Sequence, residues 1–180
     1  MAKFVSELTA AHRDFIARQK IYFVASAPHT GRVNLSPKGM DTFRVLSTTR
    51  VGYLDVTGSG NETSAHLLEN GRLTLMMCSF DAAPLIFRIY ARGRSVQPSD
   101  ADWTQLRPLF GRTLPGERQL ILADIESIQT SCGFGVPFFD YTGERETLID
   151  YAVKKGPDGM ATFRTQHNLR SIDGLPTGLK

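Results

Sequence analysis

The residues with the clearest chemical potential lie in the stretch GSGNETSAHLLENGRLTLMM, residues 58–77. It follows an apolar-rich run, VGYLDV, so we expect a strand that enters a glycine-rich turn and then a short helix. The turn carries small side chains that can donate hydrogen bonds beside the free N–H groups of a helix start, where an anion is favoured. These side chains are Ser59, Asn61, Thr63 and Ser64. Their spacing is typical of a site for a phosphate or another anion.

A capped helix with no ligand explains the same residues. Ser59 and Glu62 have the spacing of a capping box, and Asn70 with Gly71 forms a typical helix end. The common phosphate motifs do not fit, because Thr63 stands where GxGxxG has its third glycine and GxxxxGK[ST] is absent. The helix is also too short for a Rossmann unit, and the absence of GxSxG argues against Ser59 as a hydrolase nucleophile. On the residues alone, the cap and the anion site both stay open.

The elements around this turn are short strands joined by short turns. Alternation over residues 32–39, RVNLSPKG, places Asn34, Ser36 and Lys38 on one face of a strand. Alternation over residues 85–94, LIFRIYARGR, gives a cationic strand face that includes Arg88. Helical patterns cover residues 6–19, 99–110 and 142–156. Because most strand connections are too short for a crossover helix, we expect an antiparallel sheet or barrel with peripheral helices, a mainly β (α+β) fold, in one domain over residues 1–180.

Composition limits the class of protein. No apolar run approaches the ~20 residues of a transmembrane helix, so we expect no membrane partner. The two cysteines, Cys78 and Cys132, form no CxxC pair, which favours a reducing, cytoplasmic setting. The net charge of +3 is spread along the chain, which does not favour a nucleic-acid partner but suits an anionic small molecule. The four histidines lack the spacings of metal ligands, so no metal site is expected.

Four segments, taken in order, resemble the pyridoxamine 5'-phosphate oxidase-related flavoproteins over roughly residues 32–137. They are NLSPKG, YLDVTGSGNETSAHLLENGRLTLMMCSF, LIFRIYARGR and CGFGVP. The resemblance implies an antiparallel split β-barrel of the FMN-binding type. It also implies FMN as the cofactor and a homodimer with the flavin at its interface.

The resemblance further implies where the cofactor lies. In the oxidases a Ser-Arg-Lys turn holds the FMN phosphate, and counting back from Glu69 puts Asn61, Glu62 and Thr63 at those positions. The phosphate would then be held by the neutral donors Ser59, Asn61 and Thr63, with its counter-charge supplied elsewhere, by Lys38 or Arg88. The glycines on either side of Phe134, next to Cys132, suit a close backbone approach to a flavin edge or a dimer partner, and a tight turn explains them equally well. For Cys132 itself, a buried cysteine is the alternative to a reactive thiol. The expected cofactor-binding residues are Asn34, Ser36, Lys38, Ser59, Asn61, Thr63, Arg88 and Cys132.

The function implied by the resemblance is an FMN-dependent oxidoreductase that acts on an unknown small substrate. The cofactor performs the redox chemistry, and Lys38 is the candidate cation beside its ring, with no catalytic side chain predicted. The Arg-Leu-x-Pro type segment that holds pyridoxal phosphate in the oxidases is replaced here by HNLRSIDGLPTGLK, so the vitamin substrate does not carry over. Two alternatives remain. One is a deazaflavin-dependent or NAD(P)H-using reductase on the same barrel, and the other is a non-catalytic carrier or sensor that holds flavin or haem.

Overall fold

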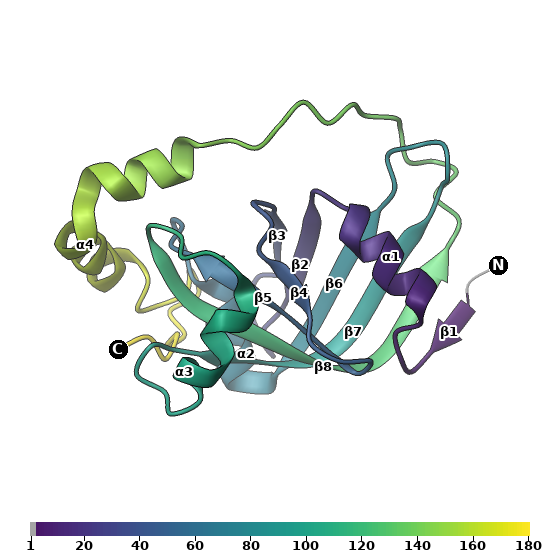
Figure 1. Cartoon of the computed structure of the whole chain (residues 1–180). Coiled ribbons are helices and arrows are strands. Elements are labelled where there is room, and N and C mark those ends of the chain that lie inside the picture. Colours follow the sequence, from purple (N-terminus) through teal and green to yellow (C-terminus); the bar gives the residue numbers. More distant parts are fainter. Residues whose placement is uncertain (1–2) are drawn as a thin grey trace.

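The computed structural model describes residues 3–180, and its centre is one antiparallel sheet of eight strands (Figure 1). Seven strands follow the order β3-β2-β6-β7-β8-β5-β4, and β1 pairs with β8. All of these pairings are antiparallel, so the predicted antiparallel sheet with peripheral helices is confirmed. The strands are β1 Lys3–Val5, β2 Tyr22–Ser26, β3 Asn34–Lys38, β4 Phe43–Val45, β5 Arg50–Val56, β6 Arg72–Cys78, β7 Ile86–Val96 and β8 Glu117–Ser131.

The sheet curls into a half-barrel that stays open. Its two edge strands, β3 and β4, follow each other in the chain but do not pair. The turn between them, residues 39–42, contains Met40 and Asp41 with φ values of 61° and 52°. A left-handed backbone is uncommon for residues other than glycine, and more so for methionine than for aspartate. A strained corner therefore joins the two edges of the half-barrel.

Helices lie around the sheet and bury their apolar sides against it. They are α1 Ala10–Arg18, α2 Glu62–Asn70, α3 Trp103–Leu106, which continues into a 3-10 turn at Arg107–Phe110, and α4 Thr147–His167. In Figure 1, α1 crosses in front of β6 and β7. Its side chains Phe15 and Ile16 join the core that the sheet encloses. The largest core members from the strands include Tyr53, Leu75, Phe87, Ile89 and Ile128.

The C-terminal part of the chain differs from the predicted helix at residues 142–156. The connection from β8 arches over the sheet, and α4 begins only at Thr147 (Figure 1). Gly156, with a φ of 68°, breaks the helix, but a second helical segment starts at Pro157 and runs to His167. Proline suits the first position of a helix because its missing N–H has no partner there. Within residues 3–180, no helix is both long and apolar enough to cross a membrane.

Candidate functional site

A polar cavity of about 220 Å³ lies where β3, the end of β5 and the start of α2 meet. We call this cavity the cradle. Its wall includes the turn between β5 and α2, the polar side chains of β3 and one arginine from β8, Arg118. Six of the eight predicted cofactor-binding residues line it: Asn34, Ser36, Lys38, Ser59, Asn61 and Thr63. Strand alternation and turn spacing thus identified side chains that the fold brings together.

Strand β3 presents its polar face to the cradle. Ser36 Oγ donates a hydrogen bond to Asn34 Oδ1 at 3.0 Å, and Asn34 Nδ2 donates to Thr63 Oγ1 at 3.1 Å. Because the Thr63 oxygen accepts from Asn34, its own hydroxyl hydrogen remains available to an acceptor in the cradle. On the opposite face of the strand, Leu35 is 63% exposed.

The floor of the cradle is a buried ionic network centred on Asp55, at the end of β5. Asp55 Oδ1 accepts from Lys38 Nζ at 2.9 Å, while Oδ2 accepts from Arg118 Nη2 at 2.7 Å and Nε at 3.0 Å and from Gln119 Nε2 at 2.9 Å. Burial alone would raise the pKa of Asp55, but the charges and hydrogen bonds of Arg118 and Lys38 outweigh burial and hold that pKa well below its usual value. Asp55 is therefore a fixed negative charge shared by two cations.

Asn61 occupies the N-cap position of α2, yet its side chain makes no capping hydrogen bond. Its Oδ1 accepts from Gln119 Nε2 at 2.8 Å, and its Nδ2 has no hydrogen-bond partner within residues 3–180 although the residue is 3% exposed. A buried donor without an acceptor is costly. The predicted capping box of Ser59 and Glu62 is wrong, because the helix begins at Glu62 itself. The cradle therefore offers an unpaired amide beside the open N–H groups of a helix start.

Glu62, the one acidic residue of the turn, is held by the C-terminal tail. Both of its carboxylate oxygens lie 3.1 Å from the backbone N–H of Ile172, which donates to them. The tail also contacts the turn through Asn168, whose Oδ1 accepts from Arg118 Nη1 at 2.8 Å and whose Nδ2 donates to the Gly58 carbonyl at 3.1 Å. Residues beyond α4 are thus part of the frame of the cradle.

Sequence reasoning missed two arginines of this region. Arg118 is buried, and its Nη1 also donates to the carbonyl of Gly60 in the turn at 3.0 Å. Arg164, on α4, lies next to Arg118 and reaches Thr57 Oγ1 at 3.4 Å. Burial and the neighbouring charge of Arg118 lower the pKa of Arg164, and no carboxylate lies within ion-pair distance of it in the described chain. A charged residue two positions before the apolar run at residues 120–123 could have pointed to Arg118, but no local pattern marks Arg164.

The lining of the cradle is balanced in formal charge, with Lys38 and Arg118 against Asp55 and Glu62. Arg164, which reaches Thr57 outside the lining, adds one cation nearby. The N-terminus of α2 adds partial positive charge. An anion of small radius with several acceptor oxygens matches this combination of charge, open helix N–H groups and an unpaired amide.

The last two predicted residues lie elsewhere in the chain. Arg88, on β7, shares the sheet face of Pro37 and Leu35 rather than that of Lys38, as the strand register shows. Its Nη1 donates to Ser131 Oγ at 3.3 Å, next to the exposed Cys132. Neither residue lines the cradle of its own chain, so a cofactor contact for Arg88 and Cys132 remains a prediction that requires a second chain.

Comparison with known families gives one match that covers most of the chain. Residues 8–132 match the family model described as pyridoxamine 5'-phosphate oxidase. A protein from Aspergillus flavus, pyridoxamine 5'-phosphate oxidase family protein ustO, is 40% identical over 195 residues, which cover 98% of this chain and 78% of the relative. The predicted family resemblance is confirmed by both matches.

Solved structures match at the level of the fold. A variant of HupZ from Group A Streptococcus aligns with a TM-score of 0.56 at 17% identity, over 68% of this chain and 98% of that one. A pyridoxamine 5'-phosphate oxidase candidate from Lactobacillus delbrueckii aligns with a TM-score of 0.54 at 18% identity, over 69% of this chain and 94% of that one. With the open, curled sheet described above, these alignments confirm the predicted split barrel.

Proposed function

This chain belongs to the pyridoxamine 5'-phosphate oxidase family, and from that premise we propose that it is an FMN-dependent oxidoreductase acting on a small substrate. The observation that carries the proposal is the cradle, and above all the buried, unpaired Nδ2 of Asn61 at the start of α2. The phosphate ester of FMN has the charge and the acceptor oxygens that this position lacks.

The residues present fit that phosphate. Asn61 Nδ2 and the hydroxyls of Thr63 and Ser59 would hold its oxygens, together with the first backbone N–H groups of α2. Arg118 orients the turn through the Gly60 carbonyl, and Arg164 balances charge from behind it. In this proposal, cations from other elements take the place of the Arg and Lys that the phosphate turn of the oxidases carries.

When bound, the flavin would supply hydride transfer to or from the substrate. The chain would contribute to that chemistry by placing a positive charge, that of Lys38, at a fixed position. Lys38 keeps its ammonium group 2.9 Å from Asp55 and 5.7 Å from the centre of the Tyr53 ring, at the edge of the cradle. Because Asp55 also pairs with Arg118, it does not neutralise Lys38 fully, and Lys38 can stabilise negative charge that develops nearby.

A visible spectrum tests the proposal directly. We expect the purified protein to take up FMN with a dissociation constant in the micromolar range or below, with a shift of both flavin absorption bands. We also expect the loaded protein to oxidise NAD(P)H or another reductant in the presence of an acceptor. Tight binding without turnover would favour the carrier or sensor, a Soret band would point to haem, and a protein that ignores FMN would overturn the proposal.

We further propose that two copies of the chain associate through the outer face of the sheet. Leu35 and Val33 on and beside β3 are 63% and 75% exposed, although both are apolar. Exposed apolar patches of this kind mark interaction surfaces. Arg88 lies on the same face, so a second copy placed there would bring its own Arg88 and Cys132 toward a partner.

The substitution Leu35→Asp should convert the dimer into a monomer, because burying an unpaired carboxylate in an apolar interface costs several kcal/mol. Light scattering during size-exclusion chromatography measures the mass. Val153→Asp is the matched control, since Val153 on α4 is also 63% exposed but lies away from this face. A wild-type monomer, or a Leu35→Asp variant that stays dimeric, would refute the proposed interface.

A further inference from the structure

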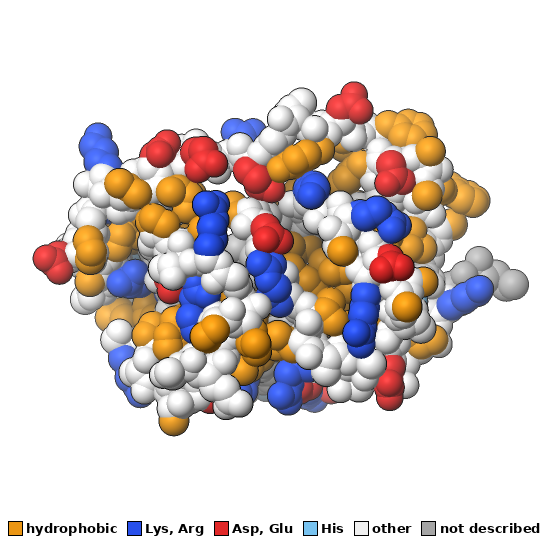
Figure 2. All heavy atoms as spheres, viewed as in Figure 1, with side chains coloured by type: hydrophobic (Ala, Val, Ile, Leu, Met, Phe, Trp, Pro, Cys, Tyr) orange, Lys and Arg blue, Asp and Glu red, His pale blue; other side chains and the backbone are white. Residues whose placement is uncertain are grey.

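A second cavity, of about 430 Å³, lies in the mouth of the half-barrel between α1 and β4. We call it the mouth pocket. Figure 2 shows a hollow at this position, lined by apolar side chains and edged by basic and acidic ones. The cavity shares no lining residue with the cradle. Its volume lies in the range of small-molecule sites.

The inner wall of the mouth pocket is apolar. It consists of side chains from α1, the edge strand β4 and the neighbouring strands: Ile16, Ala17, Phe43, Val45 and Met77, with the ring of Tyr22. Tyr22 is buried, and its hydroxyl is within 2.8 Å of Thr42 Oγ1, so its polar end is already satisfied. This wall would hold an apolar body, not a bare inorganic ion.

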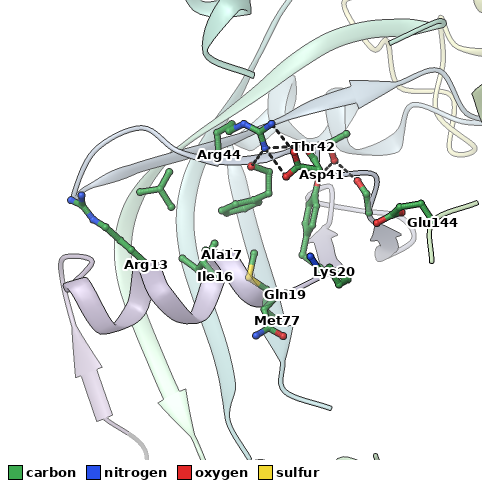
Figure 3. Close-up of a pocket in the computed structure, with 14 residues that line it drawn as sticks. Arg13, Ile16, Ala17, Gln19, Lys20, Asp41, Thr42, Arg44, Met77 and Glu144 are labelled. Atoms are coloured by element: carbon green, nitrogen blue, oxygen red, sulfur yellow. Dashed lines mark hydrogen bonds and ion pairs between the residues drawn. The ribbon is translucent and has the colours of Figure 1, made fainter. Parts of the chain in front are cut away.

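The rim of the mouth pocket carries more positive than negative charge. Arg13 on α1 and Lys20, two residues beyond the end of that helix, lie on one side, and Arg44 faces them from β4 (Figure 3). Arg44 is occupied, because its Nη1 and Nη2 lie 3.1 Å from the carboxylate oxygens of Asp41. Neither Arg13 nor Lys20 has a carboxylate within ion-pair distance in the described part of the chain.

The acidic side chain on the far rim, Glu144, also accepts hydrogen bonds from other residues of the chain. Glu144 lies in the connection between β8 and α4, and its Oε2 accepts from the backbone N–H of Met40 at 3.1 Å. Its Oε1 accepts from Tyr141 Oη at 2.9 Å. These bonds tie the connection to the strained corner at Met40 and Asp41, beside the pocket. Non-glycine residues in a left-handed conformation occur more often at functional sites than elsewhere.

The mouth pocket is separate from the cradle but adjoins it. The rings of Tyr22 and Tyr53 pack with their centres 5.7 Å apart, and Lys38 lies on the far side of Tyr53, 5.7 Å from its ring centre. Two tyrosine rings thus form the wall between the sites. A molecule in the mouth pocket can be bound without displacing a molecule in the cradle.

From these observations we propose that the mouth pocket binds a small organic monoanion, a carboxylate with a flat apolar body, between Arg13 and Lys20. The apolar wall of the cavity takes the body, and the positive charge of the rim, to which Arg13 and Lys20 contribute from its two ends, attracts the carboxylate (Figure 3). Three cations against two occupied carboxylates leave one positive charge in the lining, which matches a monoanion better than a dianion. This site does not depend on the cofactor, so it stands or falls separately from the proposed function.

The test uses naphthalene-2-carboxylate and its neutral counterpart naphthalene-2-carboxamide as probes, titrated into the full chain by calorimetry. The acid should bind about tenfold more tightly than the amide, because partly exposed ion pairs contribute a few-fold each. Arg13→Gln and Lys20→Gln should each weaken binding of the acid about threefold and leave the amide unchanged. Arg18→Gln is the matched control, since Arg18 lies on the same helix but outside the pocket lining.

The titration is repeated on protein saturated with FMN, where the affinity for the acid should not change. Equal binding of acid and amide, or an acid affinity that Arg13→Gln and Lys20→Gln leave unaltered, would overturn the proposal. Displacement of FMN by the acid would overturn it as well, because the acid would then occupy the cradle. Thermal melting of each variant confirms that it is folded before binding is compared.

Discussion

Replacing Arg118 by methionine should lower the free energy of unfolding by about 3–5 kcal/mol, the cost of removing one partner from a buried ion pair. The side chains of Arg118 and Asp55 are only 3% and 4% exposed, and their N–O distance is 2.7 Å. Methionine fills a similar volume, but it leaves the Asp55 carboxylate with Lys38 and Gln119 alone. Urea denaturation of the FMN-free protein measures the change without a contribution from bound ligand.

The matched control is Arg50→Met, which removes an ion pair at the surface. Arg50 and Asp124 lie 2.5 Å apart, but their side chains are 50% and 59% exposed. A solvent-exposed ion pair contributes about 0–1 kcal/mol to stability, so the free energy of unfolding of this variant should stay close to that of the wild type. If the free energy of unfolding fell equally in the two variants, the network around Asp55 would contribute no more to stability than a surface ion pair.

Acid should weaken the same network. The pKa of Asp55 is lowered in the folded state, since the charges of Arg118 and Lys38 overcome the effect of burial. Its contribution to stability is therefore present above the unfolded pKa of about 4 and is lost as the pH falls through the lower folded value. In Arg118→Met, this loss on acidification should be smaller, because one of the two stabilising charges is gone.

Regular patterns in the sequence were sufficient to place the β3 side of the cradle. Asn34, Ser36 and Lys38 alternate with Leu35 and Pro37, and a strand sends alternate side chains to opposite faces. The structure puts the three polar residues in the cradle and leaves Leu35 exposed. This alternation is a property of the extended backbone itself. It does not depend on what packs against the strand, so the sequence alone predicts it.

Local patterns failed where the outcome depends on contacts between distant residues. Ser59 and Glu62 have the spacing of a capping box, but Glu62 instead accepts from the amide of Ile172, which is 110 positions away in the chain. Gly156 has a sequence typical of a helix end, yet Pro157 begins a second helical segment that carries Arg164 to Thr57, beside the cradle. A short window of sequence holds no information about such partners.

For the same reason, the sequence did not identify which residues supply the positive charge at the cradle. The turn itself carries Glu62 and no cation, so the sequence left the source of positive charge open between Lys38 and Arg88. Lys38 does line the cradle, Arg88 lies on the other face of the sheet, and Arg118 and Arg164 come from β8 and α4. The positions of the last two depend on the sheet order and on the path of α4, which only the folded chain determines.

The substitution Asn61→Asp gives the most direct test of the cradle as a phosphate site. It keeps the Oδ1 acceptor that Gln119 uses at 2.8 Å, and it replaces the unpaired Nδ2 donor with a carboxylate oxygen. A bound phosphate would lose a hydrogen bond to a charged group, worth about 1.5–3 kcal/mol, and would meet a negative charge in its place. We therefore expect the affinity for FMN to fall at least about a hundredfold, which corresponds to about 2.7 kcal/mol.

Riboflavin serves as the internal control, because it carries the same ring and side chain without the phosphate. Its affinity should change by less than about threefold in Asn61→Asp, while the ratio of the two dissociation constants collapses toward one. Asn61→Leu with Thr63→Val should lower the FMN affinity by about 2 kcal/mol, because both donors are lost without added charge. If Asn61→Asp binds FMN and riboflavin in the wild-type ratio, the phosphate does not lie at the start of α2, and the unpaired amide of Asn61 must have another partner.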